Sequence, residues 1–455
     1  MRALATLAGV ATAVSTLAIS TAALAGPAET YGFLSRSTAM GGAVSADATD
    51  VSANFYNPAG LASAPGVRID IGYMRANASL RMNGKDNAVD AVHGLVFGLV
   101  APGKLLGMPF AFGVALHLPD DRVFRVRALD QQQPRWEIYD NRPQRLFFGA
   151  HLAIQPVKWL EIGGGLVFLA ATRARLDITG DLSLSDAATS RLRHEVDADL
   201  TSIRYPQLGL RLKPTDRLRL SAVYRGEFQL TLDIEARLAV QAKLRDSSCA
   251  TTLCVPFFTY LTTSSVNAFL PRQVVLGGSY DLTPDVTLDA DVTWIQWSSY
   301  KSPMSAVTAQ TKFDPPPGFP ASLTPEKPAP TVVLPPNFQN RVVPRIGVEA
   351  RLPLSPKGHS LALRGGYFYE RSPVPPQSGG TNFVDADRHA FSVGTGLKLH
   401  APFTEMPGDI HFDLHAQWSY LPERVFTKDS PADPIGDYRA SGQIWSFGTT
   451  LGLAF

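Results

Sequence analysis

The sequence predicts an all-β fold, a transmembrane antiparallel β-barrel of about 14 strands that is plugged by an N-terminal hatch. Three observations predict it. The last strand alternates large apolar with small side chains, about 14 segments share this two-residue period, and tight turns alternate with long loops between them. An even strand number with short turns on one rim and long loops on the other is typical of bacterial outer-membrane barrels.

The first 25 residues have the pattern of a secretory signal peptide. Arg2 precedes a small-apolar run from Leu4 to Ile19, and Ala23-Leu24-Ala25 matches a small-x-small cleavage site. A membrane-spanning helix is the alternative, but the run is only about 16 residues long and rich in Ala and Thr. We therefore expect an exported mature protein that begins near Gly26.

The composition excludes some classes of protein. With 455 residues, 18% charged side chains and a formal net charge of +2, the chain is neither disordered nor a nucleic-acid binder. Later residues contain no stretch of about 18 uninterrupted apolar side chains, so a membrane crossing would require a closed barrel. A soluble periplasmic β-protein is the competing interpretation. No nucleotide-binding motif occurs, and we expect no cofactor, no metal and a monomer.

Residues 26–66 precede the first strand and do not alternate. Ala, Ser, Gly and Thr dominate this segment, and such small residues let backbone pack closely in a confined space. A barrel of about 14 strands has room for a plug of this kind. We therefore assign residues 26–66 to a hatch and residues 67–455 to the barrel.

The strands follow from the two-residue period and from the turn residues that interrupt it. We expect them near 67–81, 91–100, 109–118, 145–155, 159–177, 200–213, 217–235, 272–282, 285–297, 341–353, 359–371, 388–400, 409–421 and 442–455. The tight connections are 156–158, 214–216, 283–284 and 354–358, and the long ones are 119–144, 236–271 and 298–340. Short turns are periplasmic in such barrels, which predicts that both termini are periplasmic.

The last strand shows the two faces most clearly. Trp445, Phe447 and Leu451 fall on one side, and Ser446 and Gly448 fall on the other. The large apolar face would contact lipid and the small face the lumen. A terminal aromatic strand also resembles the signal by which the barrel assembly machinery recognises outer-membrane barrels.

A soluble sandwich could show the same alternation, because it buries one face of each sheet. Aromatic residues near the strand ends favour the barrel, since they would form a girdle at the membrane surface. These residues are Trp294, Trp297, Tyr300, Trp418 and Tyr420.

Two of the long loops carry further signals. The Pro-rich segment 298–340 favours extended backbone, and it is either a cover or partner surface or a plain solvated loop. Cys249 and Cys254 are candidates for a short-loop disulfide in an exported protein. Two cysteines without nearby histidines are too few for a metal site.

Three motifs in this order resemble the FadL family of outer-membrane transporters of long-chain fatty acids and hydrocarbons. The first is Y-G-F-L-S-R-S-T-A-M-G-G-A-V-S-A-D-A-T-D-V-S-A-N-F-Y-N-P-A-G-L-A at 31–62, centred on Asn57-Pro58-Ala59. The second is D-V-T-W-I-Q-W-S at 291–298, and the third is Y-E-R-S-P-V-P-P with D-A-D-R-H-A-F-S-V-G at 369–394. The resemblance covers essentially the whole mature chain.

This resemblance implies a transport mechanism without catalysis. Apolar extracellular loops would capture a hydrophobic ligand and pass it to a pocket in the barrel, and the ligand would leave sideways into the membrane through a kink in the third strand. Long-chain fatty acids are the leading substrate, and aromatic or aliphatic hydrocarbons are the alternative. The kink candidate is Gly113, because glycine tolerates a bulge or bend.

The resemblance also implies roles for single residues. Asn57 of the hatch would be held by Glu370 and Arg388 of the barrel. The family commonly has Asp where Glu370 stands. The candidates for ligand capture are the apolar side chains Phe257, Phe258, Tyr260 and Leu261. A local loop core is the alternative interpretation of these four residues.

A fatty acid carboxylate in a low-dielectric pocket needs a cation, and arginine is the best bidentate partner. The lumen-facing candidates are Arg219, Arg345 and Arg364, with Arg351, Lys398 and His415 as further cationic groups on the same face. Each could instead belong to an ordinary polar network in the lumen.

Two rival functions come from other classes. His411, Asp413 and His415 lie on one strand face and could form an acid/base or metal site, which would make the protein an outer-membrane hydrolase. No G-x-S-x-G or H-E-x-x-H motif accompanies them, so a solvated lumen stripe is favoured. The second rival is a structural or adhesive barrel whose hatch never opens.

Overall fold

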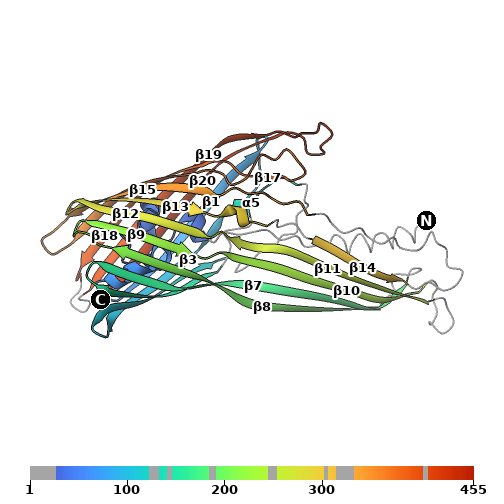
Figure 1. Ribbon diagram of the computed structural model, residues 1–455, viewed down its shortest axis with the longest axis horizontal. Coiled ribbons are helices and arrows are strands. Elements are labelled where there is room, and N and C mark those ends of the chain that lie inside the picture. Colours follow the sequence, from blue (N-terminus) through green and yellow to red (C-terminus); the bar gives the residue numbers. More distant parts are fainter. Residues whose placement is uncertain are drawn as a thin grey trace.

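The computed structural model describes residues 27–121, 133–140, 146–183, 191–243, 254–301, 306–313, 333–402 and 408–455. Fourteen strands form a closed antiparallel barrel (Figure 1). Each strand pairs with the one that follows it around the ring, and the ring closes where β20 pairs with β1, along residues 440–454 and 68–82. The strands are β1 (Arg68–Met82), β3 (Val92–Leu105), β4 (Met108–Pro119), β6 (Phe147–Val157), β7 (Leu160–Ser183), β8 (Arg191–Leu212), β9 (Leu218–Arg225), β12 (Gln273–Thr283), β13 (Val286–Ile295), β15 (Arg341–Pro353), β16 (Ser360–Glu370), β18 (Arg388–His400), β19 (Asp409–Phe426) and β20 (Tyr438–Ala454).

The barrel confirms the predicted strands and the predicted faces. In β20, Trp445, Phe447 and Leu451 are exposed on the outside, whereas Ser446 and Thr450 are buried on the lumen side. The tight turns lie at one rim, here called the turn rim, and the long connections lie at the other, the loop rim. None of the described helices is long and apolar enough to cross a membrane.

Parts of two predicted long loops are instead regular sheet. The segment 236–271 contains the end of β10 (Phe228–Lys243) and all of β11 (Cys254–Leu270), and the segment 298–340 contains β14 (Ala306–Phe313). β10 pairs in parallel with β7, and β11 pairs with both β10 and β14. Figure 1 shows these strands with β7 and β8 as an arm that extends beyond the rest of the barrel. The prediction of a loop is therefore wrong for the end of β10, for β11 and for β14.

The hatch folds inside the lumen as short helical pieces. These are α2 (Pro27–Tyr31), α3 (Ser35–Ala39), α4 (Ala53–Tyr56) and the 3-10 helix η1 (Pro58–Ser63). Asn57 caps η1, because its side-chain oxygen accepts a hydrogen bond from the Ala59 amide at 3.1 Å and Pro58 takes the first helical position. The Asn-Pro-Ala sequence thus starts this helix.

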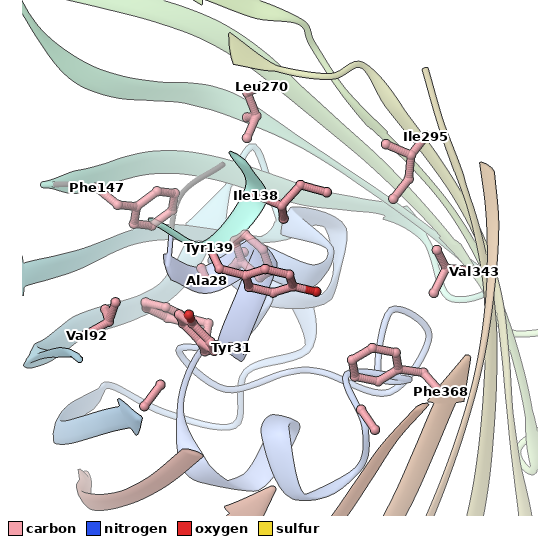
Figure 2. Packing of buried hydrophobic residues seen from close by; sticks show 14 of the residues in the cluster. Ala28, Tyr31, Val92, Ile138, Tyr139, Phe147, Leu270, Ile295, Val343 and Phe368 are labelled. Carbon is pink, nitrogen blue, oxygen red and sulfur yellow. The ribbon is translucent and has the colours of Figure 1, made fainter. Parts of the chain in front are cut away.

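Aromatic side chains join the hatch to the wall. Phe33 lies 6.0 Å from Phe55 and 5.9 Å from Phe147 of β6, measured between ring centroids. Figure 2 shows Phe147, with Ala28 and Tyr31 of the hatch, among the packed residues of the lumen. The apolar core of this protein therefore lies inside the barrel, between hatch and wall.

Candidate functional site

Eight wall glycines allow the hatch to approach the strands closely. A Cβ atom at Gly209 of β8 would overlap the side-chain oxygen of Asn57, and one at Gly347 of β15 would lie 2.6 Å from the carbonyl oxygen of Met40. At each of these glycines, hatch backbone or a hatch side chain occupies the place that a Cβ atom would take. This glycine belt consists of Gly98, Gly113, Gly163, Gly209, Gly277, Gly347, Gly366 and Gly394. The hatch is therefore seated against most of the circumference of the wall.

Asn57 makes its wall contact on β8. Its side-chain amide donates to the carbonyl oxygen of Ser45 at 2.8 Å and to that of Leu210 at 3.1 Å. Ser45 in turn donates from its amide and its hydroxyl to Asp291 of β13, at 3.0 and 2.7 Å. The hatch motif thus links two strands through one buried network.

The predicted partners of Asn57 lie elsewhere in the lumen. Arg388 donates to the carbonyl oxygen of Thr30 at 2.8 Å, so it does hold the hatch, but at α2. Glu370 pairs with Arg341 at 2.6 Å and lies 3.9 Å from Arg388. The predicted contact of Asn57 with these two residues is wrong, because Asn57 faces β8 and Arg388 lies on β18.

Gly113 does not mark a kink in this structure. The third strand of the ring, β4, pairs continuously with β3 and β6, and no register shift occurs at Gly113, which lies between Val100 and His151. A Cβ atom there would instead overlap Asn54 of the hatch. The predicted kink is wrong here, since the absence of a side chain serves hatch packing rather than a bend.

A polar vestibule of about 270 Å³ lies below the hatch at the turn rim. Arg36 of the hatch pairs there with Asp47 and, at 3.1 Å, with Glu349 of β15. Burial raises the pKa of Asp50, but Arg68 and Arg36 outweigh it, so the pKa lies below its ordinary value. The vestibule is thus lined by charged pairs, which are unsuited to an alkyl chain.

A cavity of about 70 Å³ lies on the other side of the hatch, toward the loop rim. Hatch side chains such as Phe55 and Tyr31 form one side, and strands β12, β13, β15 and β16 form another. Ile138 and Tyr139 contribute to its lining from the segment 135–140. Figure 2 shows these two side chains above Ala28 and Tyr31 of the hatch, which also line the cavity. We take this cavity as the candidate functional site.

Four arginines line the cavity, and they differ in their partners. Arg341 pairs with Glu370 and lies over the Trp297 ring at 4.9 Å, and Arg388 holds Thr30. Arg225 donates to the carbonyl oxygens of the hatch residues Phe55 and Tyr56 and lies over the Phe55 ring. Arg341 is therefore paired with a wall carboxylate, and Arg225 and Arg388 are held by carbonyl oxygens of the hatch.

The fourth is Arg345, one of the three carboxylate-anchor candidates. It donates to the carbonyl oxygen of Gly41 at 3.0 Å and lies 4.3 Å above the Phe368 ring. Among the described residues, no carboxylate forms an ion pair with it. Its positive charge therefore faces the cavity without a paired carboxylate.

The other two candidates do not line this cavity, because their charges are satisfied near the turn rim. Arg219 binds both carboxylate oxygens of Asp281 at 2.7 Å, and Arg364 lies 2.6 Å from Glu349 and 2.5 Å from Asp413. Alternation along a strand predicted that they face the lumen but not their depth. Arg351 and Lys398 are also paired, with Glu349 and Asp409.

The candidates for ligand capture lie in a strand rather than in an open loop. Phe257, Phe258, Tyr260 and Leu261 belong to β11, whose backbone pairs with β10 and β14. Only the backbone of these four positions is described. Cys254 begins β11, and Cys249 lies outside the described residues, as does the expected signal peptide.

The histidine pattern does not form a metal site in the described part of the chain, where no group of three suitable ligands converges. Asp413 is bound by Arg364, and His411 lines the vestibule. His415 is buried against the hatch beside Ser35 and Thr38. The three groups are thus part of the lumen lining, but Asp413 and His415 are buried and do not form the solvated stripe that was predicted.

Segments of the loop rim cover the cavity, although no sequence pattern predicted this cover. They are β5 (Arg135–Trp136), α5 (Glu137–Asp140), the 3-10 helix η3 (Trp297–Ser299) with Tyr300, Phe338, and β17 (Phe383–Val384). We call this set the cap. Trp297 and Tyr300 are buried in it, so their assignment to an outer aromatic girdle is wrong. The aromatic-rich motif around Trp297 was the only sequence signal, and it does not reveal the direction of the side chains.

Known proteins share this architecture. Residues 144–406 match the family described as outer membrane protein transport protein (OMPP1/FadL/TodX). The alkane uptake protein A of Marinobacter nauticus is 23% identical over 454 residues, covering 93% of this chain and 90% of that protein.

Two crystal structures are similar in fold. The P. putida toluene transporter TodX has a TM-score of 0.51 at 17% identity, covering 93% of this chain and 99% of that one. A Pseudomonas aeruginosa FadL homologue has a TM-score of 0.51 at 15% identity, covering 90% and 94% of the two chains.

Proposed function

The chain belongs to the OMPP1/FadL/TodX family of outer membrane transport proteins, and from this membership we propose that it takes up long-chain fatty acids. Transport of hydrophobic compounds across the outer membrane is the activity of the FadL/TodX type. The proposal adds the ligand, its binding site and the direction of transport. The loop rim would be extracellular and the turn rim periplasmic.

Arg345 carries the proposal for a fatty acid. It is a cation at the cavity, held by one carbonyl oxygen and one aromatic ring rather than by a carboxylate. A guanidinium in such a place can donate two parallel hydrogen bonds to an incoming carboxylate. The neighbouring rings of Phe368 and Tyr56 would contact the first methylenes of the chain.

The charged vestibule supports a sideways exit. A ligand passing straight through the hatch would meet Arg36, Glu349 and the other paired charges, and desolvating them for an alkyl chain is unfavourable. Because the pairing at Gly113 is unbroken, the exit in this proposal would be a transient opening of the wall. The process needs no catalytic step in this proposal.

Hydrocarbons are the second candidate substrate. The related alkane uptake protein and toluene transporter are named for ligands without a carboxylate. Such a ligand would use the apolar part of the cavity and gain nothing from Arg345.

Equilibrium binding of labelled oleate to the folded, detergent-purified protein would test this choice. We expect saturable binding that palmitate displaces and toluene does not, and a roughly tenfold weaker affinity in Arg345→Gln, which corresponds to about 1.4 kcal/mol. Arg351→Gln is the matched control, because Arg351 lies on the same strand but is paired in the vestibule. Displacement by toluene and an unchanged affinity in Arg345→Gln would favour hydrocarbons.

The proposal also covers processing, orientation and oligomeric state. Residues 1–25 would be removed as a signal peptide, both termini would be periplasmic, and the protein would act as a monomer. Hydrolysis of a lipid ester by the pure protein, lost in His411→Ala, would contradict the non-enzymatic assignment.

A further inference from the structure

The cap closes the cavity on the side from which a ligand would arrive. Ile138 and Tyr139 of α5 and Trp297 of η3 all line the cavity, so they stand between it and the loop rim. Tyr139 and Trp297 are buried, as is Trp136 next to α5. No large ligand could enter past these side chains without moving them.

Aromatic contacts hold the parts of the cap together. Tyr300 lies 4.5 Å from Phe338 and 6.4 Å from Phe383, and Phe338 lies 5.3 Å from Phe383 in an edge-on arrangement. Three separate segments thus share one apolar cluster. The apolar attraction in such contacts is non-directional, so the rings can separate and pack together again.

The backbone connection of the cap is short. β5 and β17 form a two-residue parallel pair in which Arg135 lies opposite Phe383 and Trp136 opposite Val384. The Arg135 amide also donates to the carbonyl oxygen of Asn382 at 3.2 Å. A pair of this length contributes few backbone hydrogen bonds, unlike the wall strands, which pair along most of their length.

A buried carboxylate, that of Glu137, bonds the segment 135–140 to a residue next to the wall. Glu137 of α5 accepts from Arg135 at 2.7 Å and from the Tyr300 hydroxyl at 3.0 Å. Arg135 belongs to the same segment as Glu137, whereas Tyr300 follows η3 directly after the wall strand β13. The Tyr300 bond therefore joins the segment 135–140 to the wall side of the cap.

We propose that the segment 135–140 is a gate that must leave its place above the cavity for ligand to enter, and that Glu137 is its latch. The inference rests on the proposed uptake function. The hatch cannot serve as this gate, because the glycine belt and the buried bonds of Asn57, Ser45 and Arg388 fix it to the wall. When the gate opens, Glu137 keeps Arg135 as its partner and exchanges the Tyr300 hydroxyl for water.

A reversible cross-link tests the gate directly. Trp136→Cys with Val384→Cys places two thiols on register neighbours, and adjacent strands lie about 4.8 Å apart, within disulfide range. Cys249→Ser and Cys254→Ser replace the native cysteines first. We expect oxidation to slow the association of labelled oleate at least tenfold and a reductant to restore it, with each single-cysteine variant as a control.

Different outcomes would overturn the gate and the proposed uptake function. Equal association rates before and after reduction, with the cross-link verified by mass, would overturn the gate. Absence of oleate binding to the wild-type protein at equilibrium would instead overturn the proposed function.

A milder variant tests the latch. Tyr300→Phe removes the hydroxyl and leaves one oxygen of Glu137 without this bond, so we expect oleate to associate and dissociate several-fold faster with nearly unchanged affinity. Tyr73→Phe is the matched control, because the Tyr73 hydroxyl bonds to Asp120 on the outside of the barrel, at 2.6 Å. Unchanged rates in Tyr300→Phe would refute the role of Glu137 as the latch.

Discussion

The lumen is closed twice, by the hatch and by the cap, and the two closures are built differently. The hatch touches the wall through backbone that fits against glycines and through buried hydrogen bonds such as those from Asn57 and Arg388. The cap has an aromatic cluster, one two-residue strand pair and the Glu137 latch. Directional polar contacts and close backbone packing resist displacement, whereas apolar contacts between flexible segments can re-form after opening.

This contrast implies that the hatch and the cap have different roles. A closure that is seated around most of the barrel circumference can seal the lumen against small solutes at all times. A closure made of a few loop segments can move for each ligand. We therefore expect mutations of the hatch to affect folding and leakage, and mutations of the cap to affect entry rates.

The largest effect should come from filling the glycine belt. In Gly209→Val the new side chain would collide with Asn57, and we expect more than about 3 kcal/mol of destabilisation, seen as loss of heat-resistant folded barrel on gels. Gly103→Val is the matched control, since a Cβ atom there meets nothing within 4 Å. Similar folding of the two variants would show that the hatch is not tightly seated.

Removing a polar tie should have the next largest effect. Arg388→Ala deletes the buried bond to the Thr30 carbonyl, which should cost about 2 to 3 kcal/mol and loosen the hatch. The measurement is passive leakage of a small dye through the reconstituted protein. Leakage as low as in wild type would contradict the role of Arg388 in holding the hatch.

The smallest effect should be a change in the stability of the cap with pH. Asp385 follows β17, is buried, and has one carboxylate oxygen without a partner in the described structure. Burial raises its pKa to about 6. Because the pKa in the folded state lies above that of a free Asp, the neutral form stabilises the cap below about pH 4, and this stabilisation is lost as the pH rises through 6.

Acrylamide quenching of tryptophan fluorescence can detect this change. We expect quenching to rise by at most twofold between pH 4.5 and 7.5 in wild type and to stay flat in Asp385→Asn, which cannot ionise. A parallel rise in both proteins would exclude Asp385 as the group responsible.

Local patterns predicted the wall well. Each of the 14 barrel strands overlaps its predicted range, because alternation and turn residues depend only on neighbours along the chain. The arm was not predicted, since β10 pairs with β7 some 60 residues away and in parallel, and no local pattern encodes such a partner.

The site was predicted only in part, for a physical reason. Alternation correctly placed Arg219, Arg345 and Arg364 on the lumen face, but their depth and partners depend on how the barrel closes and where the hatch lies. Arg345 faces the cavity because Gly41 of the hatch reaches it, whereas Arg364 meets Glu349 and Asp413 from two other strands. The cap was missed because helices as short as α5 leave no periodic signal.

The seam between β1 and β20 sets an order for biogenesis. Residues 68–82 meet residues 440–454, so the ring is complete only when the two ends of the barrel sequence come together. Ser35 of the hatch already contacts Thr450 on the closing strand, and the belt leaves no clearance for a plug to slide in afterwards. The chain must therefore enclose its own N-terminal segment as it closes, and a defective last strand would leave that segment without its enclosure.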